Sequence, residues 1–178
     1  MTRLVVGGIV VTLPVALILP SVLRVREFPR RIKCASNLHQ IGLAILDYAN
    51  EHYAQNPVSI DQLLTQPRCP PEVFICPSSN DESATGSTPT ALLGDFNKPG
   101  HCSYIYLGLG TGNSSSADTV ILYEPLSNHG WEGMNVLFGD GHAEWFDART
   151  SAKLIAIINT GVRPVRLSMI RWSAATTP

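Results

Sequence analysis

The first hydrophobic feature of the chain is an uncharged run near its amino terminus. No residue from Leu4 to Leu23 is charged, and a helix needs about 20 apolar residues to cross roughly 30 Å of hydrocarbon. A cleaved signal peptide has a shorter apolar core of about 7–15 residues and a small-residue cleavage site, whereas Arg24 and Arg26 follow this run directly. The pattern therefore predicts a retained transmembrane helix over residues 4–23, after a short cytoplasmic N-terminus at residues 1–3.

Apolar residues recur at helical spacing in the next segment, residues 24–54. They form one stripe, so the helix is expected to continue as an amphipathic helix to about residue 53. The stripe needs a covering surface, and the sheet of the same domain is the simplest candidate. His39 lies off the stripe and is predicted to be solvated rather than a ligand. The stripe consists of Ile32, Leu38, Ile41, Ile45 and Tyr48.

Residues 55–160 alternate between short periodic segments and turn-rich connections. Ser59 and Gln62 have the spacing of a capping box and predict a short helix. Residues 73–76 read as a short strand or extended segment, and residues 78–100 as a long surface loop. The other expected elements are strands within residues 102–110 and 119–126, and a helix within residues 150–160 that Thr150 or Ser151 caps and Gly161 ends.

The clearest hairpin signal is NVLFGDGHAEWF, residues 135–146. Two β-forming runs flank the sequence GDG, whose glycines supply the positive φ angles that a tight reversal requires. On the second strand His142, Glu144 and Phe146 should share one face, because side chains alternate along a strand. Trp145 lies on the other face and is expected to pack on the long helix.

Charge is scarce in this chain, at 15% of residues with a net charge of −1. The basic residues between Arg24 and Lys33 lie next to the predicted span, so anionic lipid headgroups are a better partner for them than nucleic acid. The positive-inside rule taken alone would keep the domain in the cytoplasm. The sequence contains neither a phosphate-binding loop nor a GxSxG nucleophile elbow.

Four cysteines favour a domain outside the cytoplasm, because small domains that contain several cysteines are typical of oxidising compartments. No CxxC is present, and the spacing Cys69-x6-Cys76 is poor for zinc, so structural disulfides are favoured over a metal site. Four cysteines allow three pairings, and the sequence does not choose among them. The candidates are Cys34, Cys69, Cys76 and Cys102.

Four stretches in this order carry a resemblance: RRIKCASNLHQIGLAILDYANEH, VFICPSS, SYIYLG and NHGWEGMNVLFGDGHAEWF. Together they resemble bacterial prepilin-type proteins with a processing-associated H-X9-DG domain, which are related to type II secretion pseudopilins and type IV pilins. The resemblance covers roughly residues 4–150. It implies an α+β, pilin-like fold, in which a long N-terminal helix, half transmembrane and half amphipathic, packs on a small antiparallel sheet. Residues 55–160 would form the globular domain and residues 161–178 a C-terminal tail.

The resemblance also locates the family motif and two departures from it. The motif histidine corresponds to His129 and the Asp-Gly pair to Asp140 and Gly141, with ten residues rather than nine between His129 and Asp140. Family members begin with a basic leader and a G-F-T-L-I-E site, whereas alignment on Pro20 places Arg3 where the glutamate would be. A late start codon, a diverged unprocessed subunit and a subunit that does not assemble are the open explanations.

The expected function is that of a non-enzymatic pseudopilin-like subunit of a type II secretion or type IV pilus-like system. The resemblance implies a single-pass inner-membrane protein with a periplasmic domain, whose partners are membrane lipid and either its own copies or other pilin-like subunits. Neither nucleic acid nor a small-molecule substrate is expected. Close helix approach at small residues would help assembly. The expected helix-packing residues are Gly7, Gly8 and Pro20, together with Leu38, Ile41, Ile45 and Tyr48.

Two alternatives involve ligands. A tethered periplasmic binding module that does not polymerise could hold calcium, as some pseudopilins do, through hard oxygen ligands. The chain lacks the dense run of Asp and Asn that a dedicated calcium loop has, and no other cofactor is expected. An enzyme would use His129, Asp140 and His142 as metal ligands or acid–base groups, but no nucleophile accompanies them. The calcium candidates are Asp140, Glu144, Glu132 and Asp147.

Overall fold

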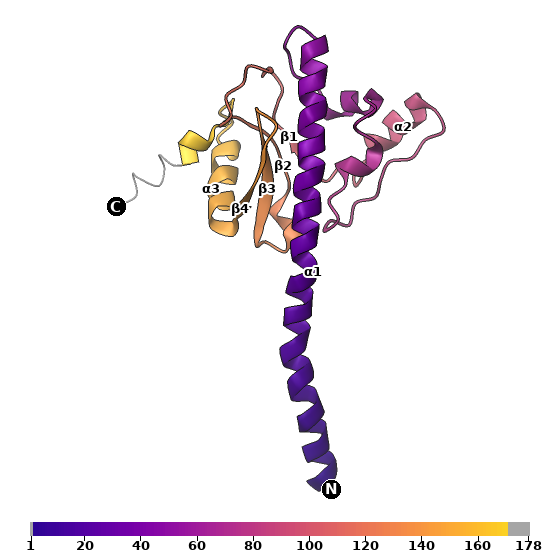
Figure 1. The fold of residues 1–178 in the computed structure, drawn as a ribbon, viewed down its shortest axis with the longest axis vertical. Helices are drawn as coiled ribbons and strands as arrows, with labels where there is room; N and C mark the ends of the chain where they lie inside the picture. The colour runs from indigo at the N-terminus through magenta and orange to yellow at the C-terminus, as the bar shows by residue number, and fades with distance from the viewer. Residues whose placement is uncertain (1, 171–178) are drawn as a thin grey trace.

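The longest element is one continuous helix, α1, from Thr2 to Glu51. The structure is a computed structural model that describes the backbone of residues 2–170 and the side chains of residues 27–170. At 1.5 Å per residue, α1 is about 75 Å long. Its second half lies within the body of the protein, and its first half projects beyond that body (Figure 1). Because α1 ends at Glu51, the predicted end of the amphipathic helix near residue 53 is confirmed.

A four-stranded antiparallel sheet lies beside α1. Its strands, in the order β1-β2-β3-β4, are Ile105–Tyr106, Val120–Tyr123, Gly133–Phe138 and Ala143–Asp147. Helix α1 covers one face of the sheet, and helix α3, Ala148–Asn159, covers the other (Figure 1). The predicted α+β class, with a long N-terminal helix on a small antiparallel sheet, is confirmed.

Strand alternation divides the hydrophobic core in two. Leu137 of β3 belongs to the core on the α1 face, whereas Val136 and Phe138 belong to the core on the α3 face. The apolar stripe of α1 was expected to be covered by the sheet of the same domain. This is what the structure shows, since Leu38 and Ile41 are completely buried on the α1 face of the sheet. Burial of one such side chain contributes about 1.5–3 kcal/mol. The other stripe residues comprise Ile45, which is buried, Tyr48, which is partly buried, and Ile32, which is 55% exposed.

A lobe of short helices packs on the side of α1 that faces away from the sheet (Figure 1). It contains two 3-10 helices, η1 (Ile60–Thr65) and η2 (Pro71–Phe74), and the helix α2 (Pro89–Phe96). The rings of Phe74 and Phe96 meet edge to face at 4.9 Å. Helix α1 is therefore enclosed between the sheet and this lobe, a second partner that its single apolar stripe did not predict.

Two element predictions in this lobe need correction. Val73 and Phe74 belong to η2 rather than to a strand, because Pro71 occupies the first turn of η2, where its fixed φ favours a helical turn, and Ile75 after it is extended. The predicted loop over residues 78–100 contains α2, whose start has a capping signal: the Thr88 side chain accepts a hydrogen bond from Ala91 N, and Pro89 follows the cap. The expected short helix at Ser59 is present as η1, with its capping box formed.

The predicted hairpin is present, and its turn is docked on α1. Strands β3 and β4 pair from Gly133 to Leu137, and Gly141 in the turn has a φ of +86°. A Cβ atom on Gly42 of α1 would lie only 3.2 Å from the Cα of Gly141. Next to this contact His39, exposed as predicted, has its Nδ1 2.8 Å from the Gly141 carbonyl oxygen. Small residues therefore allow the turn to approach the helix backbone closely.

The start of α3 corrects the predicted cap. Asp147, rather than Thr150 or Ser151, is the N-cap, and its carboxylate accepts a hydrogen bond from Thr150 N at 2.8 Å. The carboxylate also offsets the positive end of the helix dipole. After Gly161, the first part of the predicted tail packs on the sheet, because Val120 N donates to Val165 O at 2.8 Å. Residues 171–178 lie outside the described part of the chain.

The localisation prediction requires correction. Among the residues described, no helix combines the length and the apolar character needed to cross a membrane, which contradicts a single-pass inner-membrane protein. The described part of α1 carries charges of both signs, among them Glu27, Arg30 and Lys33, and such charges are costly in hydrocarbon. The side chains of the predicted span, residues 4–23, lie outside the described residues.

Candidate functional site

A disulfide joins α1 to the segment that follows η2. Cys34 and Cys76 are bonded, with their Cα atoms 5.3 Å apart, and both are completely buried. Cys69 and Cys102 are free thiols. Burial raises the pKa of Cys69 to about 12 and that of Cys102 to about 11, which keeps both in the unreactive thiol form. Two of the four predicted disulfide candidates are thus paired.

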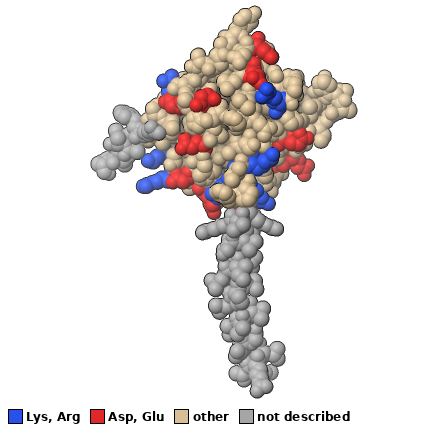
Figure 2. Space-filling view, in the orientation of Figure 1, with Lys and Arg blue, Asp and Glu red and all other residues tan. Residues whose placement is uncertain are grey.

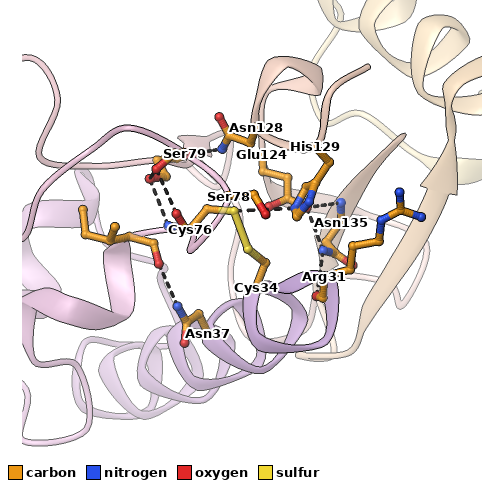
Figure 3. The surroundings of a disulfide bond; sticks show 12 residues. Arg31, Cys34, Asn37, Cys76, Ser78, Ser79, Glu124, Asn128, His129 and Asn135 are labelled. Atoms are coloured by element: carbon orange, nitrogen blue, oxygen red, sulfur yellow. Dashed lines mark hydrogen bonds and ion pairs between the residues drawn. A yellow bond between two sulfur atoms is a disulfide. The ribbon is translucent and has the colours of Figure 1, made fainter. Parts of the chain in front are cut away.

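His129 lies directly beside this disulfide (Figure 3). It ends the 3-10 helix η3, Leu126–His129, and is 2% exposed. Its Nε2 is 3.5 Å from the Cys76 sulfur and 3.0 Å from Oε1 of Glu124. On the other side of the ring, Nδ1 forms a hydrogen bond with the carboxylate of Glu27, which comes from α1. One imidazole therefore links α1, the disulfide and the end of β2.

Glu124 is the deepest charged group of the site. It is completely buried, and its Oε1 accepts hydrogen bonds from both the backbone N and the side-chain Nδ2 of Asn135, each at 2.6 Å. Its second oxygen, Oε2, has no hydrogen-bond partner among the described residues. A buried carboxylate is costly unless it is paired and hydrogen-bonded, so Glu124 depends on the positive charge that His129 provides.

Arg31 and Trp145 close the site on the α1 side. The Arg31 guanidinium lies 4.3 Å from the centre of the Trp145 ring, a cation–π contact, and it also pairs with Glu132. Trp145 in turn meets the His129 ring edge to face at 5.3 Å. The prediction that Trp145 packs on the long helix is confirmed, with Arg31 as its contact.

The surrounding carboxylates determine the charge state of His129. Burial alone would lower its pKa, but hydrogen bonds and charge interactions with Glu124 and Glu27 outweigh burial and raise the pKa above the ordinary value of 6.5. The protonated ring can donate from both nitrogens, one to each carboxylate. The charged form of His129 is consequently favoured in the folded, disulfide-bonded protein.

This shift predicts a pH dependence of stability. Because the folded pKa is raised, the contribution of His129 is fully present below its unfolded pKa, about 6.5, and is lost as pH rises through the folded value. The His129 resonance in an NMR titration of the oxidised protein should report a pKa above 6.5, and Glu27→Gln should lower that pKa by removing one carboxylate. A His129 pKa below 6.5, or one that Glu27→Gln leaves unchanged, would contradict this arrangement.

The structure separates the residues of the family motif. His129 precedes β3, whereas Asp140 and Gly141 follow it, and a six-residue strand is roughly 20 Å long. Asp140 instead accepts a hydrogen bond from the backbone N of His142 at 3.1 Å and contacts its ring. The enzyme-like set of His129, Asp140 and His142 is therefore not brought together.

The four calcium candidates are also dispersed. Asp140 is in the turn of the β3–β4 hairpin, while Glu132 and Asp147 lie at its opposite end, where one pairs with Arg31 and the other caps α3. Glu144 is exposed on β4. The group of potential metal ligands that converges within the described residues is a different one: Cys34, Cys76, Glu124 and His129, whose ligand atoms all lie within 4.8 Å of one another.

The sequence reasoning missed Glu27 and Glu124. Glu124 had a detectable signal, since it directly follows VILY, a run that forms a completely buried strand, and a carboxylate in such a place needs a partner. Glu27 had none, because it is one of several charged residues around Arg24 to Lys33. Of the predicted helix-packing residues, Gly7, Gly8 and Pro20 precede residue 27, so their packing lies outside the described part of the chain.

Comparison of the chain with protein-family models, with curated proteins and with solved structures gives no match. The resemblance to prepilin-type proteins thus depends on the sequence motifs alone. Figure 2 shows acidic and basic side chains interspersed over the displayed face of the body, with no large area of one sign among the described side chains.

Proposed function

We propose that the chain is a non-enzymatic, pilin-like structural subunit that assembles through helix α1. The observation that carries this proposal is the exposed apolar surface of α1 where the helix leaves the body. Phe28 is 66% exposed and Ile32 is 55% exposed, and residues four apart lie on the same side of a helix. An exposed apolar pair on a helix that extends beyond its own domain favours packing against another subunit.

The body is firmly attached to this helix. The Cys34–Cys76 disulfide, the pairing of Glu27 with His129 and the stacking of Arg31 on Trp145 all join α1 to other elements. Contacts of these three kinds fix the direction in which α1 leaves the body. A fixed direction suits a subunit that must present its body regularly along an assembly, and it adds support to the resemblance to pilin-like proteins.

Burial of the titratable cluster supports a role without catalysis. Glu124 is completely buried and His129 is 2% exposed, so a substrate in solution has no access to either side chain. The predicted acid–base residues Asp140 and His142 lie at the far end of β3, on the surface. The buried charges are therefore better explained as a structural connection between α1 and the sheet.

Substitution of Ile32 tests the proposal. Ile32→Glu keeps a residue that favours helix formation but places a charge in the exposed apolar pair. An isoleucine buried between subunits would contribute about 1.5–3 kcal/mol to association, and its loss raises the dissociation constant roughly tenfold or more. The full chain should therefore self-associate at least about tenfold more weakly, as measured by sedimentation velocity over a concentration series. Its melting temperature should change little, because Ile32 is exposed in the monomer.

Leu109→Glu is the matched control, because Leu109 is 63% exposed and lies beside Ala54 and Asn56, just beyond the C-terminal end of α1, whereas Phe28 and Ile32 lie where α1 enters the body. This variant should self-associate as the unaltered chain does. A full chain that stays monomeric at the highest concentration, or an Ile32→Glu variant that associates unchanged, would refute assembly through this surface.

A further inference from the structure

We infer that the protein, once the Cys34–Cys76 disulfide is reduced, binds one zinc ion through Cys34, Cys76, His129 and Glu124. The inference is independent of whether α1 assembles. It concerns the buried site around the disulfide, where four side chains of the types that bind zinc converge from α1, the segment after η2, the end of β2 and η3.

The positions of the ligand atoms fit a tetrahedral ion. Zinc bonds of about 2.0–2.3 Å give a tetrahedron with edges of about 3.3–3.8 Å. His129 Nε2 is 3.5 Å from the Cys76 sulfur and 3.0 Å from Glu124 Oε1, and all four ligand atoms lie within 4.8 Å of one another. Small side-chain movements therefore suffice once the two sulfurs are no longer bonded to each other.

Hydrogen bonds around the site already orient its ligands as in a zinc centre. Nδ1 of His129 is bonded to the Glu27 carboxylate, which leaves Nε2 facing the sulfur and Glu124. A carboxylate behind a histidine ligand is the usual outer partner of protein-bound zinc and fixes the ring orientation. The Glu124 carboxylate is likewise fixed in position, because it accepts two hydrogen bonds from Asn135.

An unsatisfied buried atom points to a ligand independently of this geometry. Oε2 of Glu124 is completely buried and has no hydrogen-bond partner among the described residues. Leaving such an oxygen unpaired costs free energy, and a divalent cation next to the carboxylate would remove that cost. All four side chains are also buried, so their ligand atoms are screened from bulk solvent.

The chemical step is a two-electron reduction followed by ion exchange. A dithiol reductant donates two electrons and two protons, becomes a disulfide itself, and converts the S–S bond of Cys34 and Cys76 into two thiols. Zinc then binds the two thiolates and Nε2 of His129, and the two thiol protons and the Nε2 proton of the charged imidazole are released to solvent. The same two cysteines would thus connect α1 to the body in both states, by a covalent bond in one and by a metal ion in the other.

Zinc titration of the full chain tests the inference. The chain is reduced with a water-soluble phosphine, which removes the disulfide by becoming a phosphine oxide, and bound zinc is measured against a chromophoric chelator. One zinc ion per reduced chain is expected, with a higher melting temperature, and no tight binding is expected by the oxidised chain. Cobalt in place of zinc should give tetrahedral absorption together with thiolate-to-metal charge-transfer bands.

Variants separate this site from binding by the free cysteines. Cys34→Ser and Cys76→Ser should abolish tight binding, and Glu27→Gln, which changes only the outer partner, should weaken it by about 10–100-fold. Cys102→Ser should retain one ion per chain, because Cys102 is not a ligand. Equal affinity in the oxidised and reduced chains, or unchanged affinity in Cys34→Ser and Glu27→Gln, would overturn the inference.

Discussion

Replacing His129 by Leu is expected to lower the free energy of unfolding of the oxidised protein by about 3–5 kcal/mol, the usual effect of removing one partner from a buried ion pair. Leucine is close to histidine in size, so much of the packing survives the change. The Glu124 carboxylate, in contrast, stays completely buried and loses the cation 3.0 Å from its Oε1. Chemical denaturation in a metal-free, non-reducing buffer measures the loss.

A double variant identifies the cause of that loss. If the unpaired charge is responsible, His129→Leu combined with Glu124→Gln should recover part of the lost stability, because the neutral amide no longer needs a cation. His142→Leu is the matched control: its ring is exposed and its pairing with Asp140 is a surface contact, so the variant should lie within about 1 kcal/mol of the unaltered protein. A His129→Leu variant as stable as the control would show that the buried network contributes nothing.

Removal of the disulfide should have an effect of similar size. Cys34 and Cys76 are 42 positions apart, and closure of a loop of this length restricts the unfolded chain by about 4 kcal/mol in the chain-entropy model, with measured losses typically about 2–5 kcal/mol. The double variant Cys34→Ala/Cys76→Ala should therefore lose stability on this scale, against a typical total of about 5–15 kcal/mol. Thermal and denaturant unfolding without reductant provide the measurement.

Reduction of the unaltered chain provides the matching experiment. In the presence of a phosphine and a chelator, the unaltered chain should lose as much stability as the double variant does. The control is Cys102→Ser, which should stay within about 1 kcal/mol of the unaltered chain, because Cys102 is a free thiol. If the double variant is as stable as the oxidised protein, the bond between α1 and the lobe is not a significant constraint.

Local sequence signals predicted the elements whose formation depends on neighbouring residues. The β3–β4 hairpin follows from strand alternation around GDG, and the end of α1 follows from its apolar period. Helix α2 also had such a signal in Thr88 and Pro89, which the polar composition of residues 78–100 obscured. The predicted cap of α3, Thr150 or Ser151, was wrong because Asp147, the last residue of β4, accepts a hydrogen bond from Thr150 N and so caps the helix earlier.

The site was harder to predict, because contacts distant in the sequence create it. His129 was singled out from its motif, but its partners Glu27 and Glu124 come from α1 and from the end of β2, and no spacing rule connects them. Similarly, Cys34 and Cys76 were two of four equivalent candidates until the fold placed η2 against α1. The enzyme alternative grouped His129 with Asp140 and His142, whereas the intervening strand β3 keeps His129 apart from both.

Photo-crosslinking from position 28 tests assembly through α1 most directly. A benzoyl-phenylalanine in place of Phe28 retains an aromatic ring at a side chain that is 66% exposed. Mixed isotope-labelled and unlabelled full chains distinguish crosslinks between chains from those within one chain, and mass spectrometry locates the linked residues. Assembly through α1 predicts crosslinks between chains that join position 28 to α1 of the second chain. Crosslinks confined to a single chain, or none at concentrations where the chain is oligomeric, would contradict it.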